Sequence, residues 1–546
     1  MTLIDGELVP RKEAMGGGYE GADRLGRELN SFRPRVLSAD SSMSEVDKQL
    51  MDARGNDLLR NVGPMQGASF IYRDSIVGSH FRLNAHPMYS VLGMDDVWAD
   101  EFQQEVEAKF MLWAESEQNW CDSTRATNFT GLIRLGLCVA FAGGEYLGTA
   151  EWANDGRPYH TCIQTVDCDR LSNPMGEMDT ARLRRGIERN RRGVPIAAHI
   201  REAHQSDAFD FEKAYRWRRV PFRKPWGRLQ VIHLMEQSRA DMTRGIAPMA
   251  AALKETHMGR KFHEITLQNA IVNASYAAAI ESELPSNLAF GAIGAEEGNY
   301  DAMVQAQMSM LGAIAEYARG SRNLQIDGVK IPHLYPGSKL KMLPAGTVGG
   351  VGQAFEDSLN RWISRTLGVS YEEYTNDYSK TNYSSSRASA NVTRRRMNAH
   401  KRAFADRLAN AVYALWLEEA IHDGTIEATK PLLARNPNFF YEGLNKEAIT
   451  QAGWIGASSG QVDELKETQA AVMRIANGLS TEEIEAAKLG SDYRDLMKQR
   501  AREIKQRQAL GLPEFPGNAT KPGTLNSQRG VDAAADTTDD DDDGLD

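Results

Sequence analysis

Apolar residues recur at helical spacing along most of the chain. Residues 52–76, 355–367, 386–422 and 425–510 show this period, which is typical of helices that bury one face. The clearest stripe lies within residues 95–116, where most acidic residues occupy other faces, and it consists of Trp98, Phe102, Val106, Phe110 and Trp113. The pattern therefore predicts a protein that is mainly helical.

The longest predicted helix covers residues 245–283. Its part at 265–280 contains no charged residue and is dominated by alanine, serine and asparagine. Small side chains on every face permit close approach to neighbouring helices, and about 40 residues at ~1.5 Å each would reach roughly 60 Å. We expect a strut of this kind in an oligomer rather than in the core of a single subunit.

Residues 130–235 show a different, partly β pattern. Apolar runs on both sides of Gly143 and Gly144 favour a hairpin, and residues 159–171, 191–200 and 228–236 resemble short strands. Residues 324–343 also alternate and contain an Asp-Gly turn signal. The chain is accordingly predicted to be α+β with helices in the majority.

A polar segment at 368–390 follows the helix 355–367. It is rich in serine, contains almost no aliphatic residue and carries Tyr371, Tyr374, Tyr378 and Tyr383. Such a segment cannot form a core, and its tyrosines suggest contact with another molecule. The helix that follows is basic, with seven arginines and lysines against Asp406 over residues 387–407. This basic stretch is either a solvated helix face or a local site for phosphate or an acidic partner.

Composition limits the classes of function. The 546 residues are 41% hydrophobic and 25% charged, with a net charge of −10, which predicts two to four soluble domains and argues against tight binding of nucleic acid. Four cysteines in a chain of this length indicate buried thiols rather than a disulfide framework. No secretory leader or bilayer-spanning run is apparent, so we expect a cytoplasmic origin and no membrane partner.

Motifs for catalysis are incomplete. HEITL at 263–267 lacks the second histidine of a zinc-protease helix, because Leu267 stands in its place. GASSG at 456–460 matches a serine-nucleophile pattern, but no parallel strand is predicted before Ser458, and a helix cap is the simpler interpretation. GGVGQ at 349–353 lacks the lysine of a P-loop. We expect no catalytic residues, no metal site and no cofactor.

Several blocks of sequence together resemble the tailed-phage portal proteins of the lambda family. The most specific is LGVSYEEYTNDYSKTNYSSSRASAN at 367–391. Other matching blocks are RGNDLLRNVG, DSIVGSHFRL, DRLSNP, VIHLMEQSRADMTRGIAP, GVKIPHLYPG, GWIG and DELKETQAAVM. The resemblance covers roughly residues 15–510 and excludes the N-terminal dozen residues and the acidic tail.

The resemblance implies a ring-forming subunit with named regions. These are a flexible N-terminal arm (1–50), a mixed α/β wing (51–243), a first stem helix (244–283), a clip (284–350), a second stem helix (351–370), a tunnel loop (371–386), a wing helix (387–424), a helical crown (425–512) and a disordered acidic tail (513–546). It also implies a ring, commonly of twelve subunits, at one capsid vertex of the virion after assembly in the host cytoplasm. The implied partners are double-stranded DNA, the terminase large subunit, the head-tail connector, and the major capsid and scaffold proteins.

A channel of this kind must touch DNA without gripping it, because tight phosphate contacts would slow its movement. We therefore expect weak, sequence-independent contacts from the tunnel loop, at Tyr378, Lys380, Asn382, Tyr383 and Arg387. The basic cluster behind it either faces the channel or braces the next subunit, and comprises Arg394, Arg395, Arg396, Lys401 and Arg402.

Three hypotheses remain distinct at this stage. The first is a non-enzymatic conduit, the second is a nuclease or a hydrolase that uses Ser458, and the third is a sequence-reading DNA-binding protein. The acidic composition and the lack of a recognition motif argue against the third.

Overall fold

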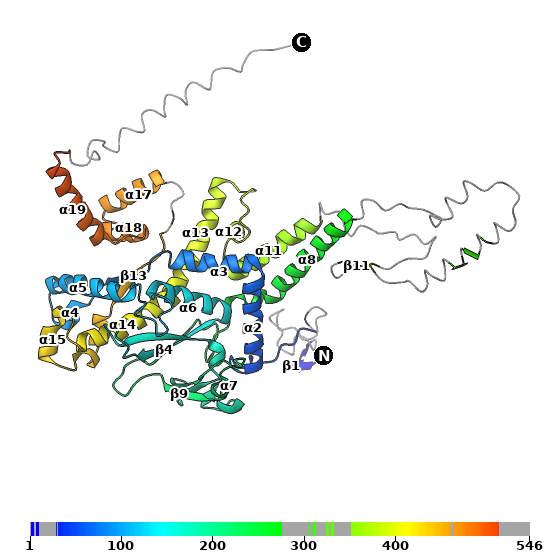
Figure 1. The fold of residues 1–546 in the computed structure, drawn as a ribbon, viewed down its shortest axis with the longest axis horizontal. Coiled ribbons are helices and arrows are strands. Elements are labelled where there is room, and N and C mark those ends of the chain that lie inside the picture. Colours follow the sequence, from blue (N-terminus) through cyan, green and yellow to red (C-terminus); the bar gives the residue numbers. More distant parts are fainter. Residues whose placement is uncertain are drawn as a thin grey trace, which may run out of the picture. The chain divides into compact units, whose positions relative to one another are not determined.

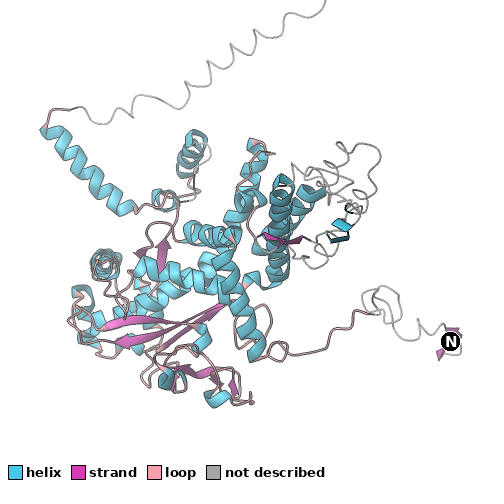
Figure 2. Ribbon diagram, turned by 45° about the vertical axis from the view of Figure 1, so that its right-hand side comes forward, coloured by secondary structure: helices cyan, strands magenta, loops and turns pink. Residues whose placement is uncertain are grey.

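The computed structural model describes residues 2–4, 7–9, 29, 31–275, 305, 308–309, 311–312, 324–326, 329–331, 351–379, 381–458, 460 and 464–512. They fall into two compact units, of which the first comprises Met1–Ala250 with Gly368–Asp546 and the second comprises Ala251–Leu367. Helices predominate and short antiparallel sheets accompany them, so the predicted α+β class is confirmed (Figures 1 and 2).

The helices of the first unit include α2 (Glu45–Asn61), α3 (Gly63–Ile76), α4 (Tyr89–Leu92), α5 (Asp96–Ala114), α6 (Phe129–Gly143), α7 (Phe211–Ala214), α12 (Tyr371–Thr375), α13 (Tyr383–His400), α14 (Asp406–His422), α15 (Lys430–Arg435), α16 (Asn445–Ile449), α17 (Glu464–Ala476), α18 (Glu482–Lys488) and α19 (Tyr493–Ala509). The stripe at 95–116 forms α5, as predicted. The predicted helix at 52–76 is divided into α2 and α3, because the chain turns at Val62 and α3 restarts with Pro64 in its first turn.

The strands of the first unit are arranged in antiparallel sheets. Their bounds are β1 (Thr2–Ile4), β2 (Glu7–Val9), β3 (Arg82–Ala85), β4 (Glu145–Trp152), β5 (Thr161–Val166), β6 (Leu183–Arg184), β7 (Ile187–Arg189), β8 (Pro195–Arg201), β9 (Trp217–Pro221), β10 (Val231–Met235) and β13 (Ala452–Ile455). The sheet orders are β10–β4–β5, β6–β7–β8–β9, β13–β3 and β1–β2. Strands β5, β8 and β10 confirm the three strands predicted between residues 159 and 236.

The core of the first unit has an apolar part and an aromatic part. Leu147, Val166, Ile187, Ala198 and Val231 are buried together, and they join the three-stranded sheet to the four-stranded sheet. The aromatic part is centred on Phe110 of α5, whose ring lies 5.2–5.9 Å from those of Trp113, Phe129, Tyr413, Trp416 and Trp454. It joins α5, α6, α14 and β13, which come from both ends of the sequence.

The hairpin predicted at Gly143 and Gly144 is wrong. Helix α6 runs to Gly143, and Gly144 then takes a left-handed conformation with φ 79° before β4 begins. A side chain on Gly144 would collide with the backbone of Ile246. The glycine pair therefore caps a helix and admits a neighbouring chain, and the apolar residues before it are buried on several faces of α6.

Contacts of the first unit cross two of the predicted region boundaries, which remain predictions. Of the arm predicted at 1–50, Asp40 is held by Arg184 (2.7 Å), Arg185 and Arg189 (3.0 Å), and α2 begins at Glu45. Within the segment predicted as crown, α16 packs on α4, and β13 pairs with β3. The end of the arm and the start of the crown thus belong to the same packed body as residues 51–243.

The second unit contains α8 (Leu253–Ser275) and α11 (Val351–Leu367), which pack through Phe262 and Phe355 at 5.5 Å between ring centroids. Strands β11 (Leu324–Ile326) and β12 (Val329–Ile331) pair as an antiparallel hairpin. These strands agree with the strands predicted within 324–343. Residues 276–283 of the predicted first stem helix lie outside the described residues, as does most of 284–350. Within the described parts of the chain, no helix combines the length and apolar character needed to span a bilayer.

Candidate functional site: the polar segment and its helix

The polar segment, residues 368–390, is tied at its start to the helix that follows it. Gly368 follows α11 with φ 73°, and Ser370 caps α12 by accepting a hydrogen bond from the Glu373 amide. The Ser370 amide in turn donates to Thr393 Oγ1 at 3.0 Å. The chain therefore leaves and returns to nearly the same place, and Tyr374 of α12 is buried against α3.

Helix α13 and helix α14 form one continuous rod. They are joined by a π-helical turn at Lys401–Ala405, in which the chain is locally wider than an α-helix. The sequence predicted one helix over 386–422, and the structure extends its start to Tyr383. Because α14 is buried in the aromatic core, α13 is held rigidly by its own extension, and it also packs on α3 (Figure 1).

The residues predicted for the DNA channel lie around the turn between α12 and α13. Tyr378 is 47% exposed there, and Asn382 caps α13 in a reciprocal pair with Ser385. Tyr383 is the first residue of α13, and Lys380 lies outside the described residues. Arg387 lies one turn further along, 3.9 Å from Glu467 of α17. The described members of this set are neighbours along the chain, and they lie at the N-terminal end of α13.

The basic cluster is not a single patch. Arg394 donates to the carbonyl oxygen of Gly460 at 3.0 Å, and Arg396 lies across Gly368. Lys401 pairs with Asp406 at 2.7 Å. Arg395 and Arg402 are exposed, and the side chain of Arg402 is 79% exposed while it lies 4.0 Å from the carboxylate of Asp406. Arg394, Arg396 and Lys401 therefore brace the fold, although Arg396 is also exposed, and Arg395 and Arg402 face outward.

Arg395 and Arg402 belong to one exposed stripe that sequence reasoning missed. The spacing alternates between four and three residues, which places the members on one face of the continuous helix formed by α13 and the π-helical turn after it. All are exposed, and they are Ser384, Ala388, Asn391, Arg395, Asn398 and Arg402. No acidic residue occurs between Asp377 and Asp406. The lack of acidic residues is visible in the sequence. The stripe is not, because the sequence does not distinguish the two outward-facing arginines from the other three cations of the cluster.

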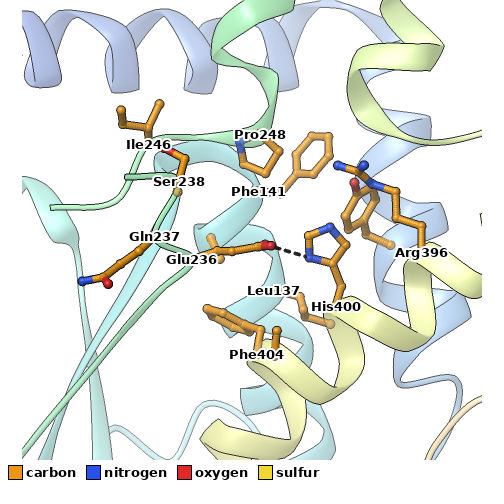
Figure 3. A pocket seen from close by; sticks show the side chains of 14 residues that line it. Leu137, Phe141, Glu236, Gln237, Ser238, Ile246, Pro248, Arg396, His400 and Phe404 are labelled. Atoms are coloured by element: carbon orange, nitrogen blue, oxygen red, sulfur yellow. Dashed lines mark ion pairs between the residues drawn. The ribbon is translucent and has the colours of Figure 1, made fainter. Parts of the chain in front are cut away.

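A pocket of about 230 Å³ lies beside the end of α13 (Figure 3). His400 projects into it, pairs with Glu236 at 3.4 Å, and lies with its ring 5.5 Å from that of Tyr72. Phe141 and Pro248 form apolar walls. Burial lowers the pKa of His400, and this effect outweighs the opposing influence of Glu236. The pocket is thus lined both by the rod and by residues 236–248, which precede α8 in the sequence.

The family-like block at 231–248 surrounds a buried carboxylate, Glu145, at the start of β4. His233 approaches it at 3.0 Å, Arg244 at 2.7 Å, and the Gly245 amide donates to it at 2.8 Å. Burial alone would raise the pKa of Glu145, but Arg244 and Lys48 hold it well below its usual range. The block at 231–248 is therefore structural, since its polar residues neutralise one buried charge.

The catalytic alternative finds no supporting geometry. Ser458 follows β13, which is antiparallel to β3, and its Oγ accepts a hydrogen bond from the Gly460 amide at 3.3 Å. In the portion of the chain described, no histidine or carboxylate pairs with Ser458. Burial raises the pKa of Cys121, Cys162 and Cys168, so these thiols are poor nucleophiles at neutral pH.

Comparison with solved structures finds remote likenesses in gene transfer agent (GTA) particles. The virion of the native GTA particle contains a chain with TM-score 0.36 and 13% identity, covering 82% of this chain and 99% of that one. The neck of the native particle computed with C12 symmetry contains a chain with TM-score 0.35 and 12% identity, covering 83% and 96%.

Comparison with known sequences is far stronger. The chain is 34% identical over 527 residues to the portal protein of Escherichia phage N15, covering 96% of both chains. It is 33% identical over 530 residues to portal protein B of Escherichia phage lambda, covering 96% of this chain and 97% of that protein. Residues 25–401 match the family described as phage portal protein, lambda family. With this match over more than half its length, the chain belongs to the lambda family of phage portal proteins.

Proposed function

We propose that the protein assembles into a ring of twelve subunits at one capsid vertex, through which double-stranded DNA is packaged and later ejected. The observation that carries the DNA part of this proposal is the acid-free exposed stripe on α13. In a protein with a net charge of −10, a rigid helix face with Arg395, Arg402 and uncharged polar residues is the described surface best suited to a passing phosphate backbone.

The arrangement suits transient contact. Two outward cations per subunit on this face would keep DNA centred, while the negative charge elsewhere would prevent tight binding. The turn at the other end of α13 would contribute Tyr378, Lys380, Asn382, Tyr383 and Arg387 to the same channel. The hydrogen bond between the Ser370 amide and Thr393 ties the polar segment to α13, so these side chains would keep their positions as DNA moves.

The exposed apolar residues of the second unit are the observation that favours assembly of several subunits. Its two helices bury only one face against each other, and Ile265, Leu267, Ile271 and Trp362 are each more than half exposed. Apolar residues in such number on a two-helix unit need cover, and equivalent helices of neighbouring subunits would supply it. We assign α8 and α11 to the stem and the β11–β12 hairpin to the clip, where the terminase large subunit and the head-tail connector would bind in turn. The remaining wing and crown would meet the capsid and scaffold proteins.

Charge reversal tests the proposed channel face. Arg395→Glu with Arg402→Glu is expected to leave ring assembly intact, as seen by electron microscopy, and to reduce packaged DNA at least tenfold in an in vitro packaging reaction. The matched control is Arg191→Glu with Arg192→Glu, which makes the same charge change at an exposed turn of the wing. Equal packaging by both double variants would contradict the assignment of this face to the channel.

A further inference from the structure

We propose that the loop between β8 and β9 is an anchor that inserts Phe209 into a pocket on the adjacent copy of this chain. The inference rests on the ring of the proposed function and assigns a specific contact within it. The loop, residues 202–216, will be called the anchor loop, and the receiving pocket lies between β10, α14 and α16.

The anchor loop exposes an unusual amount of aromatic surface. Phe209 is 101% exposed, Phe211 is 64% exposed and Tyr215 is 55% exposed, and the last two rings contact each other at 4.9 Å. Aromatic residues gathered on one loop are typical of protein interfaces, where they act as anchors in a partner's pocket. The exposure of Phe209 is otherwise unfavourable, because a full phenyl ring remains in water.

The anchor loop is ordered rather than loose. The amide of Glu202 donates to the carbonyl of Arg216 at 3.0 Å, which closes the loop at its base. At the tip, the Asp207 carboxylate accepts hydrogen bonds from the amides of Phe209 (3.0 Å) and Asp210 (3.3 Å). Phe209 is thus presented on a preorganised tip, which lowers the entropic cost of docking.

The receiving pocket has a volume of about 480 Å³, within the ~300–1,000 Å³ range of pockets that take drug-sized groups. Its apolar floor is formed by Leu229, Leu234, Ala411, Ala414 and Leu415. The volume and the floor together suit one aromatic side chain with part of its flanking backbone.

Charge favours a second copy of this chain as the occupant. The pocket is lined by three basic residues, Arg223, Arg407 and Lys446, and by one acidic residue, Glu447. In the described part of the chain neither arginine pairs with a carboxylate. The anchor loop carries four acidic residues, Glu202, Asp207, Asp210 and Glu212, against Lys213 and Arg216. Lys213 pairs with Asp210 at 3.2 Å and Arg216 pairs with Glu212, so the loop keeps an excess of negative charge. The anchor loop combines an excess of acidic residues with aromatic rings, and the pocket combines an excess of basic residues with an apolar floor, so the two are complementary in net charge and in polarity.

The two surfaces are in different places on the first unit. The anchor loop contains α7, which lies next to β9 (Figure 1). The pocket is lined by residues of α14 and α16. A contact between two different patches is heterologous, and repeated contacts of that kind close into a ring when the rotation between subunits permits. Each subunit would donate one anchor and receive one.

Disulfide trapping tests the contact in the assembled full-length protein. Phe209→Cys with Ala411→Cys, in a Cys138→Ser background, is expected to give a ladder of covalent oligomers on oxidation. The other native cysteines are buried and should not interfere. Met178→Cys with Ala411→Cys is the matched control, because Met178 is also exposed in the wing, at 89%.

The outcomes separate this contact from the proposed function. A ladder specific to the Phe209 pair supports the contact. Rings without that ladder, or a cross-link within one chain, would overturn the contact and leave the portal function intact. If the thiol introduced by Phe209→Cys is protected from oxidation only after another virion protein is added, that result would also overturn the contact, in favour of that protein. Failure of the parent chain to form rings would overturn both.

Discussion

Arg396 of α13 lies across Gly368, at the point where the chain leaves α11. A methyl group on Gly368 would overlap the Arg396 side chain, and the residue has φ 73°, a conformation that L-residues avoid. The start of the polar segment and the basic helix that follows it are therefore in direct contact. Gly368 is needed for both its backbone conformation and its lack of a side chain.

Replacement of Gly368 by alanine should destabilise the protein markedly. The left-handed conformation alone costs roughly 1–2 kcal/mol. Displacement of the flexible Arg396 side chain should add a smaller amount. Thermal denaturation compares Gly368→Ala with Gly93→Ala, which has a similar φ of 67° but no neighbour within 4 Å. Equal losses in the two variants would show that the Arg396 contact has no energetic weight.

Removal of the charge at Glu107 should stabilise the protein at neutral and higher pH. Burial raises the pKa of Glu107 from 4.5 to about 7, so its stabilising contribution is complete below pH 4.5 and is lost as the pH rises through 7. Its Oε1 accepts from the Ala85 amide at 2.8 Å, an interaction that glutamine can keep.

Glu107→Gln should thus raise the free energy of unfolding at pH 8 by on the order of 1–2 kcal/mol, with little difference near pH 4.5. Denaturant titration at the two pH values measures this. A variant less stable than the parent at pH 8 would contradict the assignment.

His400 should make the pocket region sensitive to acid. Because burial lowers its pKa below 6.5, its contribution to stability is complete above pH 6.5 and is lost as the pH falls through the folded-state pKa. His400→Gln should flatten the fall in melting temperature between pH 6.5 and 5. His86→Gln, at an exposed histidine of the same unit, should leave the fall unchanged.

The exposed face of α11 should be required for assembly. Trp362 is 63% exposed, and Trp362→Glu would place a charge in the apolar contact that we propose between subunits. Sedimentation should show a folded monomer for this variant, with helicity retained by circular dichroism. Trp362→Phe keeps an aromatic ring and should still assemble. Rings formed by the glutamate variant would place Trp362 outside the interface.

The candidate site was only partly predictable. The continuous helix that includes α13 and α14 was predicted, because helical periodicity is a local property, and Asn382 was predicted to belong to the site. The sequence did not predict which cations pair within the fold and which face outward. Arg396 and Lys401 are bound by Gly368, Phe81 and Asp406, which lie elsewhere along the chain or on the far side of the π-helical turn.

The helical majority, the position of α5, the polar segment and the resemblance to portal proteins could be predicted from the amino-acid sequence, because periodicity and motifs depend on neighbouring residues. Three features depend on the folded chain instead: Gly144 ends a helix, Asp40 anchors the chain before α2, and Arg395 and Arg402 face outward. Each of these depends on what packs against the residue, and burial and charge pairing are set by contacts between segments distant in sequence.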